Sequence, residues 1–387
     1  MPDADASPSV TDPAGLQGSL TPVVGCDDIH LDLPGRRDGK VRVSYALAAG
    51  RRLFVTTDRL SAFDRVVAVV PYKGQVLNQL AAWWFHQTRG IVANHVVSVP
   101  DPNATIGVEA RPLPVEVVVR GVITGTTSTS LWRQYDVGAR TIYGHAFPDG
   151  LRKNTRLPEA IITPTTKGEA GAHDEPLTCV EVVERGLVGS EMWTQVQTAA
   201  LALFAFGQRI AEQAGLILAD TKYEFGIAPD GSLLLIDEMH TPDSSRYWEA
   251  SSYEDRVGRG VEPESLDKEP IRLALDALGY RGSGAPPVLS GEVIASTTIR
   301  YVAAYERITG TRFVPGTYPV EERLLAAFNR EGLLPGVGCA TVLEPLNAAL
   351  MAAKIFAVTD HDIAELVKSY QESQRVRILE ADLEVSG

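Results

Sequence analysis

Runs of β-branched residues bounded by glycine, proline or aspartate fill much of residues 21–120. "VRVSYAL", "RLFVTTD", "VVAVVP" and "VEVVVRGVI" have this composition, which is typical of β-strands. Between them, "GQVLNQLAAWWFHQT" places apolar side chains at positions 76, 77, 80, 83 and 84, the spacing of an amphipathic helix. We expect Trp83 and Trp84 to anchor this helix in a core.

Longer helical patterns follow further along the chain. One begins at the N-cap candidate Ser190 and ends just before Gly215. Residues 216–239 then have the pattern of two strands, and further helices are expected at 265–279 and 291–309. Because strands and helices are mixed without regular alternation, we predict an α+β fold and not a doubly wound parallel sheet.

The strand predicted directly after the long helix carries charge on one face. "LILADTKYEFG" begins as an apolar run, but Asp220, Lys222 and Glu224 follow at alternate positions. Alternate residues of a strand point to the same side of a sheet. A buried strand with an acid, a base and another acid in a row needs an explanation beyond packing.

The next strand brings another acid close to this row. "PDG" is typical of a hairpin turn, and a two-residue loop at Asp230–Gly231 would place Glu224 opposite Asp237, with Cβ atoms about 5 Å apart. A longer loop would leave Asp237 nearer Lys222. Opposed carboxylates need a positive charge between them. Two explanations fit equally on spacing: a structural ion pair with Lys222 or an arginine, or a Mg²⁺ site, since Mg²⁺ prefers one or two carboxylates plus phosphate oxygens and water.

Segments suited to anions favour a functional site. "TPDSSRYW" follows the hairpin at once and offers hydroxyl donors and the bidentate guanidinium of Arg246. "GRRDGKVRVSY" is a basic turn, "TTDRLSAFD" ends a strand in a polar loop, and "VVVRGVITGTTSTS" runs into a Gly/Thr/Ser loop after Arg120. Each of these is weak alone, because basic turns and solvated loops are common.

Composition narrows the class of protein. The chain has 387 residues, 44% hydrophobic and 22% charged, which suits a globular protein of more than one structural unit. A net charge of −13 argues against general nucleic-acid binding, and three scattered cysteines argue against a disulfide framework. With no membrane-spanning run and an acidic, Pro-rich start, we expect a cytoplasmic protein with a disordered N-terminus over 1–20.

In order along the chain, these segments resemble the phosphoribosylaminoimidazole-succinocarboxamide synthase family, the SAICAR synthetases of purine biosynthesis. The resemblance spans roughly 21–310 and rests on "DGKVR", "TTDRLSAFD", "VEVVVRGVITGT", "TPTTK" with "HDE", "ILADTKYEFG" and "IDEMHTPDSSRYW". It implies a two-lobe, kinase-like or ATP-grasp-like architecture with a nucleotide cleft. The ATP-binding lobe would cover 21–115 and the catalytic and substrate lobe 116–310.

The family resemblance also implies a reaction and its residues. The family joins the carboxylate of carboxyaminoimidazole ribonucleotide (CAIR) to the amine of L-aspartate, with ATP and Mg²⁺, and an acyl phosphate is the expected intermediate. Lys222, Asp220 and Arg246 would be catalytic, with Lys222 and Asp220 meeting the reacting carboxylate and the incoming aspartate. For the Mg²⁺–nucleotide the resemblance implies Lys40, Arg42, Lys167, Glu224 and Asp237, of which Glu224 and Asp237 would bind the metal. Asp174 would lie beside Lys167 on the cleft. For the ribonucleotide it implies Arg120, Thr126, Asp243, Ser245 and Arg246.

The tail, 311–387, resembles instead the end of mutase-type aminoimidazole ribonucleotide carboxylase, most closely in "NAALMAAKIFA". It has neither a Gly/Ser-rich phosphate loop nor a Rossmann-like core, so we expect it to be non-catalytic. Apolar positions 363, 366, 367 and 370 have helical spacing. Such a short amphipathic segment needs a surface to cover its apolar face.

Two rival functions remain at this stage. One is a related ATP-dependent carboxylate–amine ligase with another acceptor amine, because the metal and phosphate groups are better marked than the amine pocket. The other is a non-catalytic scaffold that uses the tail to organise purine enzymes. The expected partners are the small-molecule substrates, with no nucleic acid or membrane, and a monomer or small homo-oligomer.

Overall fold

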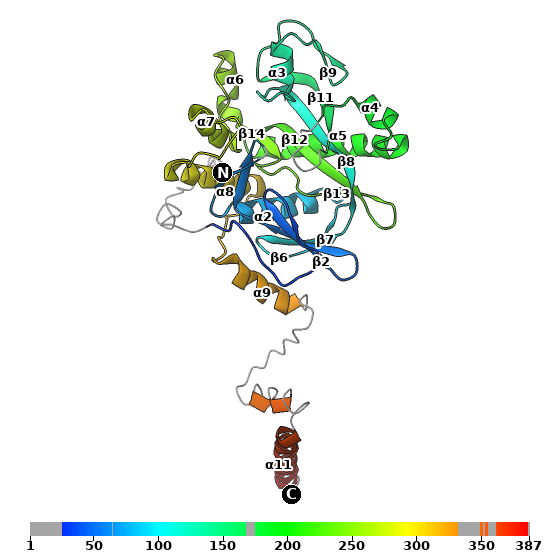
Figure 1. Ribbon diagram of the computed structural model, residues 1–387, viewed down its shortest axis with the longest axis vertical. Coiled ribbons are helices and arrows are strands. Elements are labelled where there is room, and N and C mark those ends of the chain that lie inside the picture. Colours follow the sequence, from blue (N-terminus) through cyan, green and yellow to red (C-terminus); the bar gives the residue numbers. More distant parts are fainter. Residues whose placement is uncertain are drawn as a thin grey trace, which may run out of the picture. The chain divides into compact units, whose positions relative to one another are not determined.

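The structure is a computed structural model, and it describes residues 25–63, 65–167, 175–331, 349–350, 353–354 and 361–385. The chain divides into two compact units, one ending at Glu331 and the other starting at Gly332. All sheets of the described residues belong to the first unit (Figure 1). The segment 1–20 and Asp174 lie outside the described residues. Within the described part of the chain, no helix is long and apolar enough to cross a membrane.

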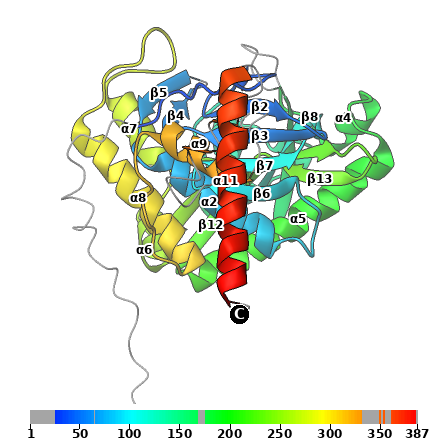
Figure 2. The same cartoon turned by 90° about the horizontal axis from the view of Figure 1, so that it is seen from below.

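An antiparallel sheet in the order β1-β2-β3-β7-β6 forms the N-terminal part of the first unit. Its strands are β1 (Arg37–Asp38), β2 (Arg42–Leu47), β3 (Arg51–Thr56), β6 (Val96–Asp101) and β7 (Ala104–Val108). Figure 2 shows β2, β3, β7 and β6 side by side. Helix α2 (Lys73–Gln87) packs on this sheet, with Trp84 fully buried and Trp83 packed against the same core. Both tryptophans are core anchors, as predicted.

A larger antiparallel sheet in the order β11-β8-β12-β13 follows, and β14 also pairs with β12. Its strands are β8 (Arg111–Ile123), β11 (Thr155–Thr166), β12 (Leu216–Ile227), β13 (Leu233–Ile236) and β14 (Ser245–Glu249). The first half of β12 pairs with β14 and the second half with β13, so β12 lies centrally in the sheet. Strand β8 runs across the lobe boundary expected at residues 115–116.

The hairpin between β12 and β13 differs from the two-residue loop expected. Ile227 pairs with Leu233, and the Ala228 N–H donates to the Ser232 carbonyl at 2.9 Å, so residues 229–231 form the loop. Gly231 takes a φ of 88°, a left-handed conformation that suits glycine and permits this longer turn. The register therefore places Glu224 opposite Ile236 and not opposite Asp237.

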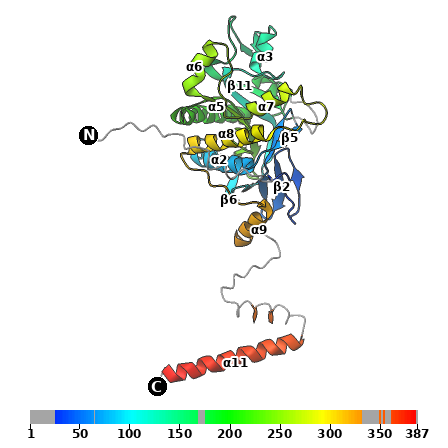
Figure 3. The ribbon, with the colours of Figure 1, turned by 90° about the vertical axis from the view of Figure 1, so that its left-hand side faces the viewer.

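Helices cover these sheets. Helix α5 (Ser190–Gln213) packs on β12, β8 and β11, and α8 (Gly291–Thr309) lies beside α2 (Figure 3). Both match the predicted ranges closely, but Gly189 and not Ser190 is the N-cap residue of α5. Helix α7 (Glu269–Ala277) lies within the predicted 265–279 and is shorter. Mixed helices and antiparallel sheets confirm the α+β class. The remaining shorter elements of the first unit are β4 (Arg59–Ala62), β5 (Arg65–Val69), β9 (Thr141–Ile142), β10 (His145–Ala146), α3 (Leu131–Asp136), α4 (Cys179–Glu184) and α6 (Ala250–Gly258).

Residues 311–331 belong to the first unit, although the tail was expected to start at residue 311. Helix α9 (Val320–Glu331) buries Leu324 and Phe328 and contacts β6. The Tyr318 hydroxyl donates to Asp58 Oδ2 at 2.6 Å, and Arg323 Nε lies 2.6 Å from Asp101 Oδ2. Apolar burial and two buried acid partners thus hold this segment to the first unit.

The second unit, taken by itself, contains helix α11 (His361–Val385). Its described side chains are mostly exposed, including Leu366, whereas Val367 is buried. The helix predicted around positions 363–370 is therefore present. The proposed cap at Thr359–Asp360 lies outside the described residues.

Candidate active site

The charged row on β12 finds its partners on the neighbouring strand β8. The register pairs Glu224 with Glu116 and Asp220 with Arg120. Lys222 lies between the two glutamates, with its Nζ 2.8 Å from Glu116 Oε1 and 2.9 Å from Glu224 Oε1. Although burial opposes it, the charges of Glu224 and Glu116 hold the pKa of Lys222 well above its usual range. A directly opposed acid pair is thus bridged by an ammonium group.

At the other end of the row, Asp220 lies between two arginines. Arg120 Nη1 is 3.3 Å from Asp220 Oδ2, and Arg246, from β14, pairs with the same oxygen. The Arg120 Nε also donates to Thr163 Oγ1 at 2.8 Å. The Asp220 carboxylate therefore orients both guanidinium groups. Because these three groups together carry a net positive charge, they can bind an anionic ligand.

Asp237 begins the loop after β13 and has a φ of 66°, a left-handed value that is uncommon for a non-glycine residue. The change of backbone direction brings its carboxylate to Arg42 of β2, which also lies 3.2 Å from Glu238 Oε2. Burial, reinforced by Glu224 and Glu238, raises the pKa of Asp237 even though Arg42 opposes the shift. The two sheets meet here: Asn94, just before β6, also bridges to Leu235 of β13.

Lys167 and Lys40 were both expected to bind the nucleotide, and they lie in two different loops. Lys167, directly after β11, pairs with Glu224 Oε2. Against the effect of burial, Lys222 and Lys167 lower the pKa of Glu224. Lys40 is exposed in the turn between β1 and β2, two residues before Arg42.

The loop between β13 and β14 is fixed by buried partners. The Asp243 carboxylate accepts from the Tyr301 hydroxyl at 2.6 Å and pairs at 2.8 Å with Lys73, whose side chain is fully buried at the start of α2. The hydroxyl groups of Ser245 and Thr221 lie 2.7 Å apart across β14 and β12. Asp243 thus connects the loop that carries Arg246 to α2 and α8.

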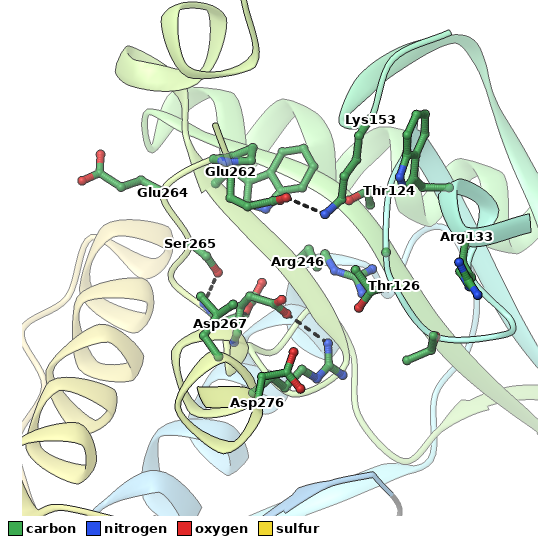
Figure 4. Close-up of a pocket in the computed structure, with 18 of the residues that line it drawn as sticks. Thr124, Thr126, Arg133, Lys153, Arg246, Glu262, Glu264, Ser265, Asp267 and Asp276 are labelled. Atoms are coloured by element: carbon green, nitrogen blue, oxygen red, sulfur yellow. Dashed lines mark hydrogen bonds and ion pairs between the residues drawn. The ribbon is translucent and has the colours of Figure 1, made fainter. Parts of the chain in front are cut away.

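Two cavities adjoin these side chains. The larger, of about 820 Å³, is lined by the Gly/Thr loop at 124–127, by Arg246 and by seven residues of the segment 262–272 (Figure 4). Thr126 is exposed on its wall. The smaller, of about 160 Å³, is bounded by Arg120, Asp220, Lys222, Asp243, Ser245 and Arg246, so it brings together residues expected for catalysis and for the ribonucleotide.

Sequence reasoning missed several charged residues of this site, among them Glu238, which pairs with Arg42. Glu116 lies within an apolar-looking strand, and only the register of β8 against β12 reveals it. Lys73 opens a helix and gives no local signal of burial. Asp267 and Lys268 line the smaller cavity from the start of α7, in a segment for which only a helix was predicted.

The acids at the Arg42 end suit a Mg²⁺–nucleotide better than a metal held by protein alone. Among the described residues, no group of three or more His, Cys, Asp or Glu side chains is arranged to hold a metal ion. Mg²⁺ commonly uses one or two carboxylates and takes its other ligands from phosphates and water. Burial is the main cause of the raised pKa of Asp237, and Glu224 and Glu238 add to it. Two carboxylates, Glu224 and Asp237, are the number that Mg²⁺ commonly takes from a protein, so the donor set fits the ion.

Comparison with known proteins gives a consistent result. Residues 36–286 match the SAICAR synthetase family. A phosphoribosylaminoimidazole-succinocarboxamide synthase of Legionella pneumophila (strain Lens) is 49% identical over 74% of this chain and 92% of its own length. A chloroplastic enzyme of the same name from Arabidopsis thaliana is 47% identical over 80% of this chain and 76% of its own. The SAICAR synthase of Saccharomyces cerevisiae, solved in complex with SAICAR, matches 75% of this chain and 100% of its own with a TM-score of 0.65 and 32% identity.

Proposed function

Because the chain belongs to the SAICAR synthetase family, we propose that it is an ATP-dependent ligase of purine biosynthesis that joins CAIR to L-aspartate. The products are SAICAR, ADP and phosphate. The observation that carries the proposal is the charged row of β12, which sets an acid cluster for a nucleotide beside two arginines for an anionic substrate. Family membership and this arrangement of charges both support an ATP-dependent ligation of an anionic substrate.

The reaction needs the carboxylate of CAIR to be activated, because a carboxylate is a poor electrophile. Transfer of the ATP γ-phosphoryl group to this carboxylate gives an acyl phosphate and ADP. The amine of aspartate then attacks the acyl carbon, and phosphate leaves. Such chemistry depends on holding the reactants in line and on neutralising phosphate charge.

We assign the nucleotide to the end of the site at β2 and β13. Lys40 and Arg42 reach it from the β1–β2 turn and β2, and Lys167 lies opposite, on Glu224. Glu224 and Asp237 would hold Mg²⁺ with the phosphates of ATP. When bound, the ion supplies positive charge that offsets the charge of the phosphates. Arg42, Lys222 and Lys167 pair with these acids. The ion pair and the Mg²⁺ site, the two explanations that the sequence left open, thus involve the same carboxylates.

The ribonucleotide is assigned to the end with Arg120 and Arg246. Arg246 and Thr126 face the larger cavity, where a guanidinium fork and a hydroxyl suit a phosphate monoester. Asp220, held by the two arginines, and Lys222, held by Glu116 and Glu224, share a face of β12 where the two ends adjoin, and there the CAIR carboxylate would meet the γ-phosphate. Ser245 supports the strand that carries Arg246 through its contact with Thr221. Both oxygens of Asp243 already have partners, which favours a positioning role over the ribose or imidazole contact that the resemblance implies.

The testing experiment is ADP release by the purified full chain with ATP, Mg²⁺ and CAIR, and with each of a panel of amino acids. Release that requires CAIR and L-aspartate together is expected. Release with a different amine would establish the rival ligase and reject aspartate as acceptor. No release with any amine would favour the scaffold. Identification of SAICAR by mass spectrometry completes the assay.

A further inference from the structure

The loop 237–244, which joins β13 to β14, has a buried histidine that the mechanism above does not use. Asp237 opens this loop, and His240 in its middle is 0% exposed. His240 has a φ of 51°, so it shares with Asp237 the left-handed conformation that non-glycine residues seldom take. Two such residues in one loop are costly, and the surrounding contacts must hold the loop in this shape.

The imidazole of His240 is enclosed by three elements of the first unit. Its Nε2 lies 2.5 Å from the Tyr223 hydroxyl on β12, and its ring meets the Trp84 ring of α2 edge to face, with centroids 4.7 Å apart. The His240 carbonyl accepts from the Tyr247 hydroxyl of β14 at 2.8 Å. Burial lowers the pKa of His240 to about 3, so the ring is neutral. Packing and hydrogen bonds therefore set its position.

Helix α5 approaches the same ring through Gly207. A methyl group on Gly207 would place its carbon 2.2 Å from His240 Cε1 and 2.7 Å from Nδ1, which is closer than such atoms can approach. It would also lie 2.9 Å from Leu218 Cδ2, but that atom ends a flexible side chain. Glycine weakens a helix interior relative to alanine. The imidazole that lies against it explains why this point of α5 needs a glycine.

The second ring nitrogen of His240 is buried without a partner. Among the described residues, the Tyr223 hydroxyl has His240 Nε2 as its sole partner, so it donates there and the neutral ring carries its proton on Nδ1. Nδ1 has no hydrogen-bond partner within the described part of the chain. An aliphatic side chain would fill this space without that cost. The imidazole thus serves the shape of the loop, through its bond to Tyr223 and its tolerance of a left-handed backbone, more than it serves stability.

We propose that His240, seated against Gly207, is a positioning residue that fixes the course of the loop 237–244 and, through it, the carboxylate of Asp237. The proposal rests on the proposed function, in which Asp237 serves the Mg²⁺–nucleotide. His240 itself contacts neither the nucleotide nor the reacting atoms in this assignment. It acts by holding the backbone that presents the acid.

The place of the ring predicts which end of the site depends on it. Glu238, two residues before the ring, lies 3.2 Å from Arg42 and continues the acid cluster. Arg120 and Arg246 stand instead on β8 and β14, which are held by their own pairing with β12. A displaced imidazole should therefore disturb the Mg²⁺–nucleotide more than CAIR.

The test uses the full chain and two variants that disturb the ring from opposite sides. Gly207→Ala adds a methyl group against it, and Tyr223→Phe removes its hydroxyl partner without adding volume. Gly207→Ala should lower kcat by about tenfold or more, because small displacements at a reacting centre are costly. It should raise the Kd for Mg²⁺–ADP, measured by titration calorimetry, by a similar factor and leave the KM for CAIR within about twofold. Tyr223→Phe should give the same split with changes of about threefold.

A double-mutant cycle distinguishes positioning by the ring from simple packing of the helix. His240→Asn keeps a residue that tolerates the left-handed backbone but leaves room for a methyl group on α5. In a chain that already carries His240→Asn, Gly207→Ala should therefore change kcat by less than about twofold. Losses that multiply independently would show that Gly207 serves the packing of the helix alone, and would overturn the proposal.

Matched controls are Gly258→Ala at the end of α6, where a methyl group meets nothing within 4 Å, and His86→Asn, an exposed histidine in the last turn of α2. Neither should change any constant. The proposal is rejected if Gly207→Ala and Tyr223→Phe both leave kcat and the Kd for Mg²⁺–ADP unchanged, or if the KM for CAIR rises as much as that Kd.

Two other failures are recognised separately. Misfolding of Gly207→Ala would appear as a lower urea midpoint, and Tyr223→Phe, which adds no volume, then decides. Failure of the proposed function would appear in the unaltered chain as no aspartate-dependent ADP release, whereas the Mg²⁺–ADP titration would still test the role of His240.

Discussion

Strand β12 and helix α11 are opposite exceptions to the rule that apolar residues are buried and charged residues are exposed. Strand β12 is central in a sheet yet carries Asp220, Lys222 and Glu224, and each of these charges has a partner on a neighbouring strand or loop. Helix α11 has apolar positions at helical spacing, yet Leu366 is 69% and Val376 45% exposed. Charge that is buried and compensated marks a site for chemistry, whereas exposed apolar side chains mark a helix face that no described residue of the same unit covers.

The largest effect is expected when one charge is removed from the site, which tests whether its buried charges serve the reaction. Asp237→Asn should lower turnover by about 10²–10³-fold, because it removes a ligand charge for Mg²⁺–ATP and one of the two acid partners of Arg42. Steady-state ADP release over a range of Mg²⁺ concentrations measures the effect, and the melting temperature shows whether the fold is intact. Near-normal turnover at saturating Mg²⁺ would exclude a metal role for Asp237. The exposed Asp255→Asn serves as the control.

Replacement of Arg246 by lysine should have the next largest effect. Arg246→Lys keeps the charge but loses the planar fork that can hold Asp220 and a phosphate at once. The KM for CAIR should rise by about tenfold or more, while the KM for ATP stays nearly constant. Arg259→Lys, at an exposed pair on α6, is the matched control. Equal changes in both KM values would show that Arg246 is structural or belongs to the nucleotide end.

Local patterns anticipated most elements and the charged row, because both depend on residues close in sequence. Helices α5 and α8 lie where their apolar spacing predicted. The pairing of the row could not be predicted, because Gly231 in a left-handed conformation lengthens the hairpin by a residue and β8 supplies Glu116. The position of Asp243 depends on Lys73 and Tyr301, which are distant in sequence. Long-range register and buried ion pairs are set by tertiary structure, which a single sequence does not display.

Two truncations separate the packed part of the C-terminal region from the rest. A chain ending at Glu331 keeps α9, whereas a chain ending at Pro315 loses buried Leu324 and Phe328 and the Tyr318 and Arg323 contacts. The longer chain should unfold in urea like the first unit of the full chain. The shorter should lose roughly 3–6 kcal/mol of unfolding free energy from the burial of Leu324 and Phe328 and the two buried polar contacts alone. Equal stability of both chains would show that 316–331 contributes nothing.

The smallest expected effect concerns the tail beyond residue 331, whose removal should leave ligase turnover unchanged within about twofold. No residue assigned to the site lies there, and the segment has no Gly/Ser-rich loop to bind a phosphate. Its only histidine is His361, an exposed residue at the start of α11, where a solvated helix end is the ordinary role. The full chain should therefore form no carboxylated product from aminoimidazole ribonucleotide with bicarbonate, or from its N-carboxy isomer, above the spontaneous rate. Product that depends on the chain, and disappears when it is truncated after Glu331, would give the tail a catalytic role and overturn this prediction.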